Sequence, residues 1–209
     1  MARAKAITLS PIANDVDYIS TTETLTTPWV LQLDGVTTLT QPQHVTLTTS
    51  TNETGETFTV VGTDRYGNAM TEVLAGPNAT IVVGTKNFAT VTSITGTADA
   101  SAVTAGVDGT CESGWYVLNY RGNDFSVGLG LDIATAGAGT GAVQHTFNNV
   151  LAQGFVEDDA TVHTHDTITG KTANFDGNYT SPPVACRLAL TAFTSGSVTL
   201  RIVQSGSGS

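Results

Sequence analysis

The chain has 209 residues, a formal net charge of −10 at pH 7 and only 12% charged residues. Eight Lys and Arg are too few for the basic surface that nucleic-acid binding requires, and the acidic balance argues against docking on anionic lipid. The length fits one large β domain or two of about 100 residues, and either can bury enough apolar surface to fold without disulfides.

The N-terminal segment, residues 1–27, is polar and rich in Thr and Asp, with scattered apolar side chains. We expect it to form an N-terminal arm with at most one marginal strand. The first residues lack the apolar core of about 7–15 residues that marks a signal peptide. No stretch approaches the roughly 20 apolar residues of a transmembrane helix. We therefore expect a protein that is made in the cytoplasm and binds no membrane.

A first β domain is predicted over residues 28–107. Threonine-rich runs alternate apolar and polar residues with period two, and β-branched Thr fits a half-exposed strand better than a helix. Residues 64–68 end in Gly67-Asn68, which is typical of a hairpin closed by a bulge. The expected strands are 29–33, 43–49, 57–61, 69–75, 80–83 and 88–95.

A second β domain is predicted over residues 115–204, after a glycine-rich boundary at residues 96–114. Its clearest alternation is 125–133, where the apolar residues share one face and Gly128 and Gly130 lie on the other. Glycines on an outer face favour close approach by another backbone or sheet. The other expected strands are 142–147, 184–192 and 197–204, with residues 148–160 mostly loop.

These elements predict an all-β protein of two tandem antiparallel β-sandwich or jelly-roll-like domains. The arm precedes them, and residues 205–209 form a flexible Gly/Ser tail.

Two histidines, His163 and His165, are the strongest candidates for metal ligands. Spaced i and i+2 on a strand, both rings would point to one face. An ion would need a third ligand, so a solvated pair of loop histidines is the favoured interpretation. Cys186 is predicted to be a buried thiol and Cys111 a loop thiol, and two cysteines make no disulfide framework.

Catalytic signatures are missing from the sequence. It has no Gly-x-Ser-x-Gly elbow between a strand and a helix and no phosphate loop that opens a helix. Residues 64–68 and 175–178 resemble fragments of calcium loops, but neither has the full set of ligands, and turn formation explains both. We therefore expect a non-enzymatic protein with no catalytic, cofactor-binding or metal-binding residues.

Parts of the chain resemble small virion proteins of tailed bacteriophages. The stretches that carry the resemblance are turns and strands at residues 62–74, 76–78, 85–94, 143–147, 170–174, 176–179 and 194–200. It implies a virion protein that decorates or cements a capsid, with the major capsid protein or head–tail proteins as partners. It also implies a homo-oligomer, with a trimer favoured by the symmetric positions of a capsid.

Three alternatives remain open. The resemblance also fits a head–tail adaptor or tail component. A carbohydrate- or host-surface-binding β module should show exposed Trp and Tyr around a concave site, and a hydrolase should show carboxylates or histidines that converge in one pocket.

Overall fold

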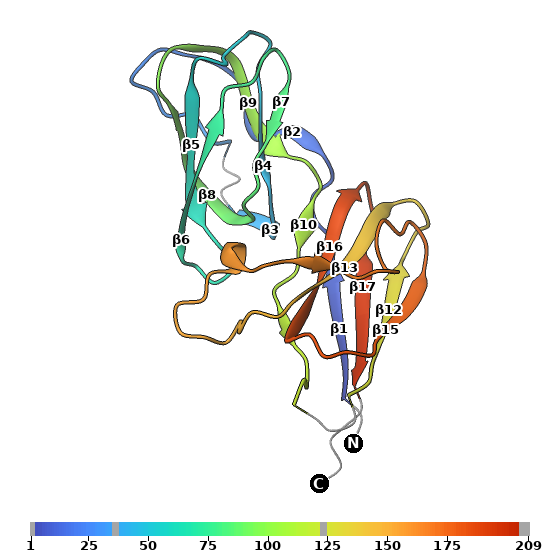
Figure 1. Cartoon of the computed structure of the whole chain (residues 1–209). Coiled ribbons are helices and arrows are strands. Elements are labelled where there is room, and N and C mark those ends of the chain that lie inside the picture. The colour runs from blue at the N-terminus through green and yellow to red at the C-terminus, as the bar shows by residue number, and fades with distance from the viewer. Residues whose placement is uncertain (1–2, 35–37, 122–124, 205–209) are drawn as a thin grey trace. The chain divides into compact units, whose positions relative to one another are not determined.

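The computed structural model describes residues 3–34, 38–121 and 125–204, and almost all of its regular structure is β (Figure 1). Within those ranges there is no α-helix, only the three-residue 3-10 helix η1 (Glu157–Asp159). The predicted all-β class is confirmed. No helix in the described part of the chain is long and apolar enough to cross a bilayer.

The chain divides into two compact units. One is Pro11–Cys111, called here the inserted unit, and the other combines Met1–Ser10 with Glu112–Ser209, called here the split unit. The two domains are therefore not simply in tandem, because the inserted unit interrupts the split unit in sequence.

The inserted unit is a sandwich of two four-stranded antiparallel sheets. In strand order the first is β2 (Asp15–Leu25), β9 (Ala100–Val107), β4 (Val45–Thr48) and β7 (Ile81–Val83). The second is β3 (Thr38–Gln43), β8 (Phe88–Gly96), β5 (Thr57–Thr63) and β6 (Ala69–Ala75). Both sheets contribute to one apolar core, with Ile19 and Leu47 from the first and Phe58 and Phe88 from the second.

The split unit also has two sheets. One has the order β1 (Arg3–Leu9), β17 (Val198–Gln204), β12 (Val127–Ile133) and β15 (Phe175–Tyr179). The other has the order β10 (Cys111–Glu112), β16 (Ala185–Phe193), β13 (Gly139–Thr146) and β14 (His163–Thr164), and β11 (Tyr116–Val117) also pairs with β16. The sheets pack closely, because a Cβ on Gly141 of β13 would lie 3.1 Å from Leu131 of β12.

The prediction of an N-terminal arm is wrong. Figure 1 shows β1 (blue) beside β17 (red), and the two strands pair residue by residue from Arg3↔Gln204 to Leu9↔Val198. β2 pairs with β9 in the inserted unit. Leu9, Ile19 and Leu25 are buried, so each unit takes one of its strands from residues 1–27.

Two further predictions need correction. Residues 29–33 form no strand, only the bridge Val30↔Thr95, although Trp29 is buried and its Nε1 donates a hydrogen bond to the Ala98 carbonyl at 2.7 Å. Residues 96–114 are more than a boundary, because β9 lies there between β2 and β4. Residues 148–160 form turns and η1, as expected of a loop, and the predicted tail at 205–209 lies outside the described residues.

The alternation predicted for residues 125–133 is present in the structure, but it begins at Val127. Val127, Leu129, Leu131 and Ile133 are buried and the residues between them face outward. The residues of β17 alternate in the same way, so this sheet has one apolar face in the core and one outward face. In β15, at the edge of the sheet, Tyr179 is the buried residue.

Candidate functional site

The predicted histidine pair lies in and just after β14. His163 is exposed and faces His145 across the β13–β14 pairing, whereas His165 is buried. The interpretation of a solvated loop pair is therefore wrong, because the two side chains have different surroundings. The structure also adds His145, whose position beside His163 was not predicted.

Five rings form a cluster at this end of the split unit. The rings of His145 and His163 stack with centroids 5.6 Å apart, and Phe147 meets them edge-on at 5.6 and 5.5 Å respectively. Tyr179 of β15 lies 5.2 Å from the ring of His145 and 4.9 Å from that of His165. β13, β14 and β15 thus bring together rings that are up to 34 residues apart in the sequence (145 to 179).

A pocket of about 340 Å³ opens beside this cluster. The aromatic side of its lining comes from His145, Phe147 and Tyr179, and its polar side includes Asp166 and Ser181. The volume lies at the lower end of the range for small-molecule sites, roughly 300–1,000 Å³.

Hydrogen bonds fix the tautomer of His165. Its Nδ1 accepts from the backbone N–H groups of Thr167 and Ile168 at 3.2 and 3.3 Å. The ring proton must then be on Nε2, which donates to the Asn178 carbonyl at 3.2 Å. His165 therefore ties its own loop to β15.

The histidines do not gather into a metal site. No three His, Cys, Asp or Glu side chains in the part of the chain that the structure describes are placed to hold one ion. Both nitrogens of His165 are already engaged in hydrogen bonds, which is unfavourable for a metal ligand.

Burial lowers the pKa of His145 below its ordinary value of 6.5. The neighbouring imidazoles of His163 and His165 lower this pKa further, and the Asp166 carboxylate partly opposes them. Tyr179 and Cys186 also pack against this end of β13. A proton on His145 would be poorly solvated and close to two other imidazoles.

The split unit should therefore lose stability in mild acid. Because the unfolded chain protonates residue 145 more readily than the folded one, this contribution is complete above about pH 6.5 and decreases as the pH falls toward the lowered pKa. Urea unfolding followed by Trp115 fluorescence, in a Trp29→Phe background, should show a falling midpoint between about pH 7.5 and 5. A His145→Gln variant should show a smaller fall, and an equal fall would contradict the assignment.

The hydroxyl of Tyr179 is buried without a hydrogen-bond partner among the described residues. Burial raises the pKa of this phenol, and nearby Cys186 and Asp166 add to the effect. A buried unpaired hydroxyl costs about 1–3 kcal/mol.

Tyr179→Phe should therefore leave the free energy of unfolding unchanged or raise it by about 1 kcal/mol. Chemical denaturation of the variant and the parent at pH 7.5 checks this. A loss of more than about 1 kcal/mol would mean that the hydroxyl has a hydrogen-bond partner in the folded protein.

The two fragments that resemble calcium loops have different structures. Residues 64–68 are a turn, as predicted. Asp64 Oδ1 accepts from the N–H groups of Tyr66 and Asn68 at 2.8 and 2.9 Å, and Gly67 has a φ of +82°. Residues 175–178 are not a turn, because they belong to strand β15.

Two buried carboxylates form hydrogen bonds that hold loops in place. The Glu72 carboxylate accepts from the Thr85 N–H at 2.6 Å, and Glu53 accepts from the Ser101 N–H at 3.1 Å, so each holds a loop.

Cys186 is buried as predicted, and burial raises the pKa of its thiol to about 12. The loop assignment of Cys111 is wrong, because this residue is buried in β10.

Comparisons with known proteins assign no family. No family model matches the chain, and no curated protein matches its sequence. A solved structure titled as the infectious bursal disease virus VP2 subviral particle is 9% identical, with 97% of this chain and 72% of that chain covered. Its TM-score of 0.17 is too low to carry any argument about fold or function.

Proposed function

We propose that this chain is a non-enzymatic structural protein of a tailed-phage virion that decorates or cements the capsid. The resemblance of its turn and strand segments to such proteins supports the proposal, as does a charge-poor all-β chain. The protein would act by docking onto copies of itself and onto the major capsid protein.

The observation that carries the proposal is the outward face of the sheet β1-β17-β12-β15. Ala4, Val203 and Gly128 lie side by side across three strands, and so do Ala6, Arg201 and Gly130. A Cβ on Gly128 or Gly130 would meet only its own sheet, at 3.9 or 3.8 Å.

The small residues of β1 and β12 on this outward face, on either side of β17, let another surface approach the backbone closely there. Val203 is 50% exposed on it, and a shallow hollow of about 270 Å³ lies over β1 and β17. Among the described residues of the split unit, nothing outside this sheet lies within 4 Å of a Cβ at either glycine, so a separate molecule can approach them.

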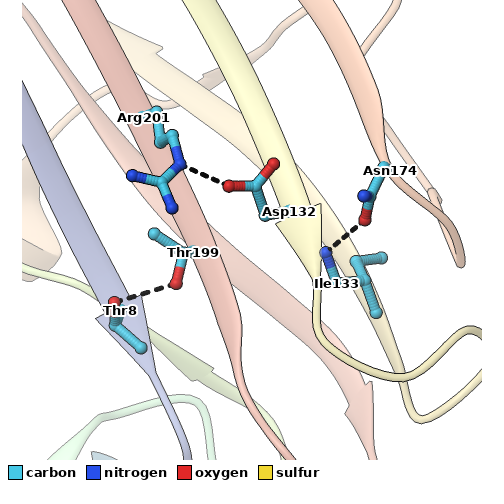
Figure 2. A network of polar contacts seen from close by, with 6 residues as sticks. All are labelled: Thr8, Asp132, Ile133, Asn174, Thr199 and Arg201. Carbon is cyan, nitrogen blue, oxygen red and sulfur yellow. Dashed lines mark hydrogen bonds and ion pairs between the residues drawn. The ribbon is translucent and has the colours of Figure 1, made fainter.

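The polar groups at one end of this face are already paired (Figure 2). The hydroxyls of Thr8 and Thr199 are 2.9 Å apart, and Arg201 forms an ion pair with Asp132. Asn174 Oδ1 accepts from the Ile133 N–H at 2.8 Å. Docking would therefore bury paired groups, which costs less than burying a lone charge.

Light scattering on a size-exclusion column tests the docking face. The parent protein should elute as a homo-oligomer, with a trimer expected, and Gly130→Arg should give the 21.5 kDa monomer with an unchanged unfolding midpoint. Gly55→Arg is the matched control, because Gly55 is in open space in the inserted unit. If Gly130→Arg has the same mass as the parent, the oligomer does not use this face.

A head–tail adaptor or tail component would use the same face with a different partner. Labelling the protein in intact particles distinguishes the two, because a decoration protein would lie over the capsid shell and an adaptor at the neck.

A further inference from the structure

The pocket beside the histidine cluster has no part in the proposed docking, and the residues that line it point to a ligand. We propose that it binds one neutral sugar residue, with Phe147 stacked on the sugar ring and Asp166 and Ser181 bonded to its hydroxyls. This inference goes beyond the proposed function, because a capsid-binding protein needs no such site.

Phe147 supplies the stacking surface. It follows the end of β13 and is 59% exposed, which is high for a large apolar ring in a folded protein. The ring is nevertheless restrained, because the adjacent imidazoles of His145 and His163 both contact it edge-on. An exposed ring that is fixed before binding loses little entropy when a ligand packs on it.

The polar residues of the lining can form hydrogen bonds with the hydroxyl groups of a sugar. The Asp166 carboxylate only accepts hydrogen bonds, whereas the Ser181 hydroxyl can donate or accept. A sugar hydroxyl is both donor and acceptor, so it can pair with each of these groups.

Other ligand classes fit the lining less well. Asp166 in the lining and the net charge of −10 repel anions. The described residues hold no set of three metal-ligating side chains. A fully apolar ligand would bury Asp166 and Ser181 without partners. An organic cation could use Asp166 and the rings, but it would leave the Ser181 hydroxyl unpaired.

Titration of the ¹⁵N-labelled full chain tests the site, with D-glucose, D-galactose, D-mannose and N-acetylglucosamine as separate probes up to about 100 mM. At least one sugar should shift the amide signals of Phe147, Asp166 and Ser181 in a saturable way. Phe147→Ala should weaken binding at least about tenfold, whereas Leu151→Ala, which removes another exposed apolar side chain outside the pocket, should not.

Asp166→Asn should weaken the same sugar several-fold, with Asp159→Asn as the control outside the pocket. The proposal is overturned if none of the four sugars shifts these amides, or if Phe147→Ala binds like the parent. It is equally overturned if choline chloride saturates the pocket and the sugars do not. None of these results affects the oligomer measurement, so the proposed function would stand or fall separately.

Discussion

Gly106→Ala should destabilise the inserted unit by about 3 kcal/mol or more, since overpacking against rigid backbone is at the costly end of such substitutions. The new Cβ would lie 2.0 Å from the Asp15 carbonyl oxygen and 2.5 Å from the carbonyl carbon of Val16. Both atoms belong to the backbone of β2, so β2 would have to separate from β9. Urea unfolding followed by Trp29 fluorescence, in a Trp115→Phe background, measures this unit alone.

Gly55→Ala is the matched control for this prediction, because Gly55 lies in the same unit as Gly106. It is a turn glycine, and a Cβ there meets nothing within 4 Å. It should leave stability unchanged or raise it by about 0.5–1 kcal/mol, because alanine loses less backbone entropy on folding. Equal effects of the two substitutions would contradict the close approach of β2 to Gly106.

Removal of residues 1–27 should abolish the cooperative unfolding of both units. The deletion takes β1 from a sheet of the split unit and β2 from a sheet of the inserted unit, together with buried Leu9, Ile19 and Leu25. An arm that only served assembly could be removed without this loss. Circular dichroism and thermal unfolding of the truncated protein distinguish the two cases.

Point substitutions in β2 test the same claim without truncation. Ile19→Ala should cost about 2–5 kcal/mol, because Ile19 is completely buried in the core of the inserted unit. Val16→Ala should cost no more than about 0.5 kcal/mol, because Val16 is 41% exposed. If Ile19→Ala is as mild as Val16→Ala, or the truncated protein still unfolds cooperatively, these residues are not part of the core.

The alternation of apolar and polar residues was sufficient to predict a strand where the strand's own residues determine its structure. The strand at residues 69–75 matches β6, and the apolar residues of β12 face the core as expected. The partner of β1 was not predictable, because β17 is almost 190 residues away and no local signal reports on such a pairing. Mostly polar strands such as β2 are also difficult to recognise, since few of their residues are apolar.

The histidine cluster was predictable only in part. The spacing of His163 and His165 was visible in the sequence. The register that brings His145 opposite His163, and the crossing of β15 that adds Tyr179, depend on tertiary structure. One signal was available, because alternation along residues 142–147 places Val143, His145 and Phe147 on the same side of a strand.

The outward face and the pocket depend on different residues of the split unit. The face depends on small residues of β1 and β12, whereas the pocket depends on rings and polar groups around β13, β14 and β15. Substitutions at Gly130 and Phe147 should therefore have independent effects, because Gly130 neighbours Arg201 within its own sheet whereas Phe147, after β13, contacts His145 and His163.

Co-sedimentation with purified capsids that lack the protein tests directly whether this chain docks the outward face of its β1-β17-β12-β15 sheet onto a virus particle. We expect the parent protein and Gly55→Arg to sediment with the capsids to a saturable stoichiometry, and Gly130→Arg to stay in the supernatant. A parent protein that remains in the supernatant, or a Gly130→Arg variant that sediments as the parent does, would contradict docking by this face.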